Sequence, residues 1–330
     1  ELSPVQMNHL QQELESKIMD RTLLILDIFA SRAVTKEGKI QVELAQLRYR
    51  AVRLVGLGSS LSRLGGGIGT RGPGEKKLEM DRRLIKERIS QLKKELEHVK
   101  KHRELLREGR KKDRVMTAAI VGYTNAGKST LLNTLTDAGV LSEDKLFATL
   151  DPTTRLLELD GGQRIYLTDT VGFIRKLPHH LIEAFKSTLE EAKYADVILH
   201  VVDASNPQVE EQMFIVYETL RDLGVKDKTI VTLFNKQDRL AGDEILRDFK
   251  ADYVLKISAR TGLGLDELKN TLEKILIGNQ IYIERVLDYK DAGMLQLVRK
   301  YGQLIEEKYT ENGIEIKARV PKDIYGRLGE

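Results

Sequence analysis

A glycine-rich stretch near the middle of the chain has the residue types and spacing that hold phosphate groups. Residues 122–129 read Gly-Tyr-Thr-Asn-Ala-Gly-Lys-Ser, directly after an apolar run and before a segment with helical spacing. Such glycines let backbone N–H groups point at phosphate oxygens, and the start of the following helix adds its positive end. We expect Lys128 to reach the β- and γ-phosphates and the Ser129 hydroxyl to ligate Mg²⁺. The motif in this context predicts a nucleoside triphosphate site.

A second motif supplies an acid and a glycine for the same site. Asp169-Thr-Val-Gly172 follows the apolar run 164–168 and begins 47 residues after Gly122. An acid at a strand end can hold the water shell of Mg²⁺, and the Gly172 N–H can sense the γ-phosphate. Asp-x-x-Gly alone is a common turn, so its weight comes from its position after a strand.

A third motif selects the base. In Asn235-Lys-Gln-Asp238, which follows the apolar run 229–234, the Asp238 carboxylate can accept from guanine N1–H and N2–H₂ together. Adenine offers neither donor there and would leave a buried charge unpaired. We expect Asn235 to brace neighbouring loops and the stem of Lys236 to cover the base plane. Ser258 and Ala259, at the end of the next apolar run, are placed to give a backbone N–H to guanine O6.

The loop that senses the third phosphate is assigned to residues 147–154, Phe-Ala-Thr-Leu-Asp-Pro-Thr-Thr. Thr149 is expected to be the second hydroxyl on Mg²⁺, with Thr153 and Thr154 as alternatives. Catalysis is expected of Lys128, Thr149 and Gly172, and metal binding of Ser129, Thr149 and, through water, Asp169.

The motifs together nominate one set of nucleotide-binding residues. These are Gly122, Tyr123, Thr124, Asn125, Ala126, Gly127, Lys128, Ser129, Thr130, Phe147, Ala148, Thr149, Leu150, Asp151, Asp169, Thr170, Val171, Gly172, Asn235, Lys236, Asp238, Ser258, Ala259 and Arg260.

The elements that position these motifs follow from the apolar pattern. Short apolar runs alternate with amphipathic segments through residues 115–278, which predicts an α/β domain with a mostly parallel sheet and helices on both faces. The expected strands are 116–121, 156–159, 164–168, 197–202, 229–234 and 253–257. Residues 279–330 are expected to form a small α+β domain, with strands at 281–287 and 314–320 and a helix near 295–309. No chemistry is identified in this last part.

The front of the chain, residues 1–114, predicts an extended helical arm. Apolar residues step by four and three through 40–54 and 85–99, which is the narrow stripe of an antiparallel coiled-coil hairpin. The second helix is expected to run from about 75 to 112. An isolated apolar run at 23–28 is assigned to a subdomain that lies partly upstream of Glu1, so the front domain is expected to be partial.

Charge and glycine content point the arm toward a polyanion. Residues 1–114 hold 26 Lys and Arg against 16 Asp and Glu, whereas the chain as a whole has a net charge of only +4. Six glycines between Gly65 and Gly74 could lie flat on a phosphate backbone, with Arg63 and Arg71 adding charge. The alternatives are a solvated helical surface and a flexible connector.

Composition excludes several classes of protein. The chain has no cysteine, so disulfides and thiolate metal sites are ruled out. No apolar run approaches the about 18 residues that a membrane span needs. A cytoplasmic protein is expected.

With these residues in view, the chain resembles the HflX family of GTPases, within the Obg–HflX group. The specific matches are 147–151, Asp169-Thr-Val-Gly-Phe173 with Ile-Arg following, and 65–83 (GGGIGTRGPGEKKLEMDRR). The resemblance implies GTP and GDP as ligands, the large ribosomal subunit and its RNA as partners, and nucleotide-dependent splitting of stalled or idle ribosomes. DNA is not expected. Alternatives are a ribosome-assembly GTPase and a signalling or scaffold module whose coiled coil binds a protein.

Two positions bear on the rate of hydrolysis. Phe173 stands where many related GTPases have a glutamine that orients the attacking water, so hydrolysis by the free protein is expected to be slow and to be accelerated by a partner. Asn125 stands where potassium-activated relatives place a ligand for K⁺; the alternative is that it only braces the loop. Arg155 and Arg175 are the candidates for an arginine finger.

Overall fold

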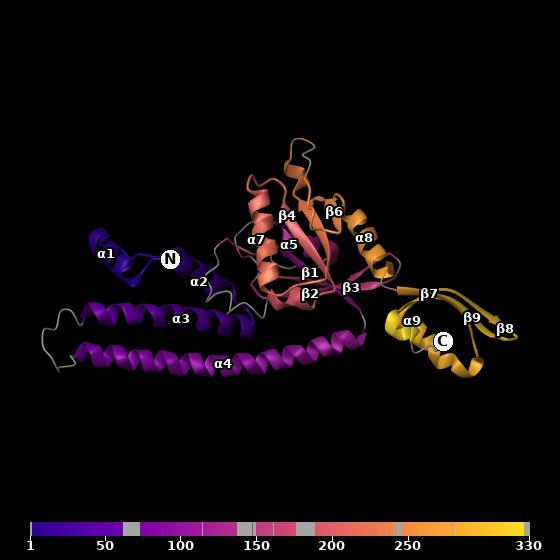
Figure 1. Cartoon of the computed structure of the whole chain (residues 1–330), viewed down its shortest axis with the longest axis horizontal. Helices are drawn as coiled ribbons and strands as arrows, with labels where there is room; N and C mark the ends of the chain where they lie inside the picture. The colour runs from indigo at the N-terminus through magenta and orange to yellow at the C-terminus, as the bar shows by residue number, and fades with distance from the viewer. Residues whose placement is uncertain are drawn as a thin grey trace.

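The computed structural model describes residues 2–61, 73–113, 115–136, 147, 150–160, 162–175, 189–240, 242, 246–278 and 280–326. A central α/β domain carries two long antiparallel helices on one side and a small sheet on the other (Figure 1). Among the described residues, no helix combines the length and the apolar character that crossing a membrane requires.

The central sheet has six strands in the order β2-β3-β1-β4-β5-β6. The strands are β1 (Met116–Gly122), β2 (Thr153–Glu158), β3 (Arg164–Asp169), β4 (Val197–Asp203), β5 (Thr229–Asn235) and β6 (Tyr253–Lys256). Only β2 runs antiparallel to its neighbour β3; the pairs from β3 to β6 are parallel. The expected mostly parallel sheet is confirmed, and the carboxyl ends of its parallel strands bring the motifs to one edge.

Helices cover both faces of this sheet because alternate strand residues point to opposite sides. Ala118 and Ile120 of β1 lie in a core with α5 (Lys128–Thr136) and α8 (Leu265–Gly278). Ala119 and Val121 lie in a second core, with α7 (Val209–Asp222). A short 3₁₀ helix, η1 (Gln237–Arg239), follows β5.

One of the two short front helices belongs to that second core. Helix α1 (Pro4–Leu14) precedes α2 (Arg21–Arg32), whose buried residues Ile25, Leu26 and Phe29 pack with the α7 face of the sheet. The apolar run 23–28 therefore packs on the central domain, and its assignment to a subdomain that lies partly upstream stays a prediction. A sequence pattern shows that a helix face is apolar but not which partner covers it.

The predicted arm is confirmed. Helices α3 (Lys36–Leu61) and α4 (Pro73–Asp113) lie side by side and antiparallel (Figure 1). Their contact is the expected stripe, made by Ile40, Leu44, Leu47, Ile89, Leu92, Leu96 and Val99. Near the base of the arm, the Arg103 guanidinium of α4 pairs with Glu37 of α3 and lies 3.7 Å from Glu191 of the central domain. Residues 62–72, which hold most of the glycine-rich loop with Arg63 and Arg71, lie outside the described residues.

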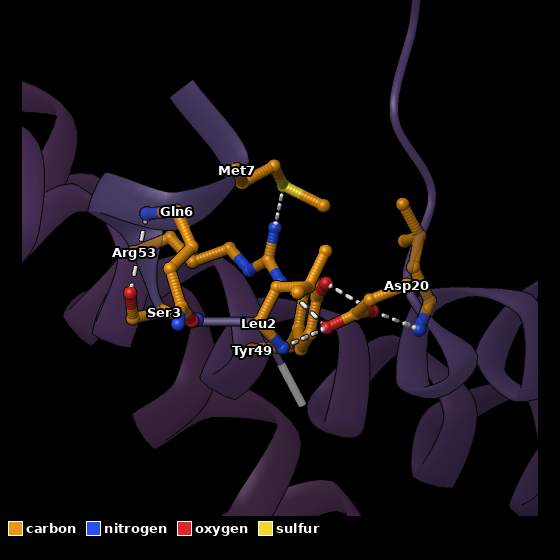
Figure 2. Close-up of polar contacts among 8 residues, drawn as sticks. Leu2, Ser3, Gln6, Met7, Asp20, Tyr49 and Arg53 are labelled. Atoms are coloured by element: carbon orange, nitrogen blue, oxygen red, sulfur yellow. Dashed lines mark hydrogen bonds and ion pairs between the residues drawn. The ribbon is translucent and has the colours of Figure 1, made fainter. Parts of the chain in front are cut away.

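A buried acid ties the front helices together (Figure 2). Asp20 caps α2 by accepting from the Leu23 N–H at 2.9 Å. It also accepts from Tyr49 Oη at 2.7 Å and pairs with Arg53 at 2.8 Å, both on α3. Arg53 donates in turn to Met7 Sδ of α1. One carboxylate thus organises three helices.

The last part of the chain forms a separate antiparallel sheet in the order β7-β9-β8. Its elements are β7 (Gln280–Leu287), η2 (Tyr289–Asp291), α9 (Ala292–Tyr301), β8 (Gln303–Thr310), β9 (Gly313–Pro321) and α10 (Lys322–Tyr325). The helix expected near 295–309 was wrong beyond 301, because residues 303–310 pair with β9 as a hairpin. Gln163, in the β2–β3 turn, donates to Gln303 at 3.2 Å and joins this sheet to the central domain.

Candidate nucleotide site

The phosphate-binding loop connects the end of β1 to the start of α5. Its backbone is left-handed at Asn125 (φ 63°) and Gly127 (φ 99°). A Cβ on Gly127 would lie 2.2 Å from Asn235 Nδ2, and one on Gly122 would lie 2.2 Å from the Val201 carbonyl oxygen. Gly122 is therefore required by the close approach of the β4 backbone, and Gly127 by the Asn235 side chain and by the left-handed path of the loop.

Lys128 stands buried at the first position of α5, only 6% exposed. Its Nζ donates to the Tyr123 carbonyl at 2.9 Å, across the loop. Burial is the main cause that lowers the pKa of Lys128 to about 8. The Asp169 carboxylate raises this pKa, and the positive charge of Lys236 lowers it. An anionic phosphate beside this ammonium would favour its charged form, so the residue is poised for an anion.

Two of the three nominated metal-binding residues meet in the structure. Ser129 Oγ donates to Asp169 Oδ2 at 2.7 Å, and Asp169 is fully buried at the end of β3. A hydroxyl and a carboxylate are hard oxygen donors of the kind that Mg²⁺ takes beside a phosphate, so the pair fits that ion. Among the described residues there is no group of three or more acids or histidines that could hold a metal by themselves.

The Asp-x-x-Gly segment lies directly on the phosphate-binding loop. A Cβ on Gly172 would come within 2.7 Å of Thr124 Cα and 3.0 Å of Lys128 Nζ. The next residue is tied to the loop by two backbone hydrogen bonds, from Phe173 N to the Gly122 oxygen at 3.0 Å and from Thr124 N to the Phe173 oxygen at 2.8 Å. Thr170 Oγ1 donates to the Ile120 carbonyl at 2.8 Å, and Val171 is buried.

Asn235 joins two loops, as expected. Its Nδ2 donates to the Ala126 carbonyl of the phosphate-binding loop at 2.8 Å, and its Oδ1 accepts from the Ala259 N–H at 2.8 Å. The Ser258 N–H donates to the Leu263 carbonyl at 2.9 Å. Both backbone donors nominated for guanine O6 are thus used within the protein, and that contact stays a prediction.

Asp238, the acid predicted to select the base, is exposed and held by one hydrogen bond. Asp238 Oδ1 accepts from Ser258 Oγ at 2.6 Å. This hydrogen bond lowers the pKa of Asp238 below its usual value, against a small opposing effect of burial. The carboxylate is therefore held ionised, which is the state that accepts from two guanine donors. Arg260 is exposed beside this loop, and Thr130 is half-buried in the first turn of α5.

The sequence reasoning missed Asp203, which ends β4. Its Oδ2 lies 2.8 Å from Lys236 Nζ, and its Oδ1 accepts from Ser205 Oγ at 2.6 Å. The ion pair holds the Lys236 side chain in one direction. The Lys236 backbone is left-handed (φ 65°). The sequence could have indicated Asp203, because it directly follows a run that was expected to be a strand ending at the same sheet edge as β1 and β5.

The loop assigned to the third phosphate is described in part. Ala148 and Thr149 lie outside the described residues. The alternatives Thr153 and Thr154 both lie within β2, and Thr154 Oγ1 is 2.9 Å from Thr168 Oγ1. Leu150 is buried.

Two further candidates have partners in the protein. Both oxygens of Asp151 accept hydrogen bonds from Val34 and Thr35, at the start of α3, and its nucleotide contact stays a prediction. Of the finger candidates, Arg155 donates to the Thr154 carbonyl at 3.1 Å and Arg175 pairs with Glu211 at 2.7 Å.

Comparison with known proteins gives the family. Residues 1–30 match the family described as GTP-binding GTPase N-terminal, residues 32–110 the GTP-binding GTPase Middle Region, and residues 117–236 the 50S ribosome-binding GTPase. The GTPase HflX of Lacrimispora saccharolytica is 68% identical over 330 residues, which span 100% of this chain and 78% of that protein. The chain belongs to the HflX family of GTPases. The GTPase HflX of Escherichia coli K12 is 49% identical over 332 residues, spanning 99% of this chain and 78% of that protein.

A solved structure agrees with the fold of this HflX-family chain. The GTP-binding protein of the archaeon Sulfolobus solfataricus in complex with GDP is 29% identical, with a TM-score of 0.50, over 83% of this chain and 78% of that one. The HflX-family chain therefore binds guanine nucleotide and is a GTPase, and its P-loop GTPase fold is confirmed.

Proposed function

We propose that this GTPase binds the large ribosomal subunit and, in a nucleotide-dependent way, separates stalled or idle ribosomes into subunits in the cytoplasm. The observation that carries the proposal is the arm. Helix α4 has 41 residues. At about 1.5 Å of rise per residue it is roughly 60 Å long, which is enough to enter a deep RNA-lined surface. The basic balance of residues 1–114 suits a phosphate backbone.

Each motif has a proposed role in the GTP cycle. Lys128 binds the β- and γ-phosphates, and the Gly172 N–H senses the γ-phosphate. Ser129, Thr149 and, through water, Asp169 would hold Mg²⁺, which supplies charge neutralisation to the phosphates when bound. Asp238 selects guanine. The buried ammonium and the 2.7 Å pairing of Ser129 with Asp169 support this arrangement.

Hydrolysis by the free protein is proposed to be slow. Phe173 is buried and offers no polar side-chain atom to a water molecule, while its backbone is bonded to the phosphate-binding loop. A group from the partner, or a K⁺ ion beside Asn125, would then complete the site. Turnover that is equally fast without ribosomes would contradict the first part, and equal rates in Na⁺ and K⁺ would contradict the second.

The deciding experiment is sedimentation of 70S ribosomes with the protein and either a non-hydrolysable GTP analogue or GDP. Separation into subunits with the analogue, and not with GDP, is the expected result. Stable co-sedimentation without separation would favour an assembly factor instead.

The arm can be tested within the same assay. Reversing two exposed charges on α4, Lys94→Glu and Lys101→Glu, should weaken ribosome binding and lower its salt dependence, by about 0.7–0.9 in log–log slope per lost phosphate contact. The matched control reverses Lys226 and Lys274, which are exposed on the central domain. Equal effects of the two pairs would mean that general charge, not the arm, drives binding, and binding insensitive to salt would favour a protein-binding scaffold.

A further inference from the structure

The base of the arm is capped by a residue of the loop assigned to the third phosphate. Asp151 Oδ2 accepts from the backbone N–H groups of Val34 at 3.0 Å and Thr35 at 2.9 Å, and Oδ1 accepts from Thr35 Oγ1 at 2.5 Å. Thr35 Oγ1 in turn accepts from the Gly38 N–H at 3.0 Å, as a helix N-cap does. The carboxylate therefore extends the cap of α3 from 116 positions away, and its charge faces the positive end of that helix.

Gly38 makes this contact possible. A Cβ on Gly38 would lie 2.4 Å from Asp151 Oδ1. A side chain at this position would push the carboxylate off the cap. Alanine in the first turn of α3 would favour the helix more than glycine does. Glycine at this position therefore serves the contact with Asp151.

The other described end of the loop is fixed to α2. The Phe147 ring packs edge-on against Phe29, with 4.7 Å between centroids. The Phe147 N–H donates to Thr124 Oγ1 of the phosphate-binding loop at 2.9 Å, and its backbone is left-handed (φ 56°). Phe147 therefore cannot move relative to the phosphate-binding loop without repacking against the front helices.

The segment after Asp169 reaches the same helix. Val171 and Phe173 share the apolar core of Ile25 and Leu26. Arg21, at the start of α2, donates to the Arg175 carbonyl at 2.6 Å. Both loops that would respond to the third phosphate are thus packed on α2 and the start of α3.

We propose that Asp151 and Phe147 couple the occupancy of the γ-phosphate site to the orientation of the α3–α4 arm, with α2 and the capped first turn of α3 as the coupling element. The inference rests on the proposed nucleotide site but not on the ribosomal role. A nucleotide that binds one loop arrangement better than another shifts the equilibrium between arm orientations, by a factor equal to the ratio of the two affinities. By linkage, a partner that holds the arm changes the affinity for GTP relative to GDP by the same factor.

The test measures arm position and nucleotide affinity in the full chain. Because the sequence has no cysteine, Lys94→Cys on α4 and Asp222→Cys at the end of α7, both exposed, give one clean pair for spin labels. Distance distributions by pulsed electron resonance are compared with GDP and with a non-hydrolysable GTP analogue. In the labelled parent the two distributions are expected to differ.

Gly38→Ala is the decisive variant, since it displaces the Asp151 carboxylate from the cap by a substitution at a position that is not nominated for nucleotide binding. It should make the two distance distributions coincide and change the ratio of GDP to analogue affinity by about 3- to 10-fold, the scale of one helix cap. Its GDP affinity should stay within about twofold of the parent, because the loop that carries Asp151 is expected to respond to the third phosphate, which GDP lacks. Asp151→Ala should have the same effect on arm position. Asp27→Asn, an exposed acid on α2, is the control and should change nothing.

Three results would overturn the inference. The parent distributions could be identical with the two nucleotides. They could differ equally in the parent and in Gly38→Ala. The Asp27→Asn control could match Gly38→Ala in both readouts. A parent that binds neither nucleotide would instead refute the proposed nucleotide site, and the coupling with it.

Discussion

Asn235 offers the sharpest test of how the site is held together. Its side chain is 2% exposed and makes two 2.8 Å hydrogen bonds, to the carbonyl of Ala126 and from the N–H of Ala259, each of which is 1% exposed. Asn235→Ala removes both partners and leaves a buried acceptor in the phosphate-binding loop and a buried donor in the base-binding loop.

The magnitude follows from these two groups. Each unsatisfied buried polar group costs about 1–3 kcal/mol, so the pair costs roughly 2–6 kcal/mol. In the free protein the loops can relax toward water, whereas bound nucleotide requires both loops in place. We therefore expect most of the cost to appear in binding, with GDP affinity lowered by about 30-fold or more, the equivalent of about 2 kcal/mol.

Isothermal titration with GDP and with a non-hydrolysable GTP analogue measures this loss. Both nucleotides should lose affinity equally, because Asn235 bridges loops rather than touching the third phosphate. Asn235→Asp should do no better than alanine, since a carboxylate oxygen would face the Ala126 carbonyl. Asn270→Ala, the same exchange at an exposed position of α8, should stay within about 0.5 kcal/mol. The reasoning is refuted if Asn235→Ala keeps GDP affinity within about threefold, or loses only the analogue.

Three further predictions follow from single contacts. Asp238→Asn should lower GDP affinity by about 100-fold or more and improve binding of xanthosine diphosphate, because the xanthine O2 accepts where the guanine N2–H₂ donates; competition titration checks the exchange. Gly172→Ala should slow hydrolysis by about tenfold while GDP binding is kept, because the new Cβ meets Thr124 Cα at 2.7 Å and forces the segment off the phosphate-binding loop; single-turnover hydrolysis is the readout. Burial raises the pKa of Asp20, but hydrogen bonds from Tyr49, Leu23 and Leu2 and the charge of Arg53 together outweigh it and leave the pKa below its ordinary 3.8. The stability from this acid should therefore be complete above that value and be lost as pH falls through the lower folded pKa; urea unfolding at several acidic pH values should show a drop that Asp20→Asn lacks.

Local motifs could be read from the sequence because their chemistry is set within a few residues. The loop before Lys128, the acid at Asp169 and the Asn235 to Asp238 motif each depend on a strand end, a turn and one side chain. Apolar runs placed those strand ends, and parallel strands bring their carboxyl ends to a single edge. The arm was equally accessible, since a stripe that repeats by fours and threes specifies its partner helix along its whole length.

Only the tertiary structure decided the contacts between residues that are distant in the chain. The apolar face of α2 predicted burial, but its cover comes from Phe147, Val171 and Phe173, far along the sequence. Residues 303–310 are a strand because β9 pairs with them, although their own pattern suited a helix. The nucleotide contact of Asp151 stays a prediction, but nothing in the sequence indicated that this carboxylate also caps α3. Its spacing from the other motifs says nothing about donors 116 positions away.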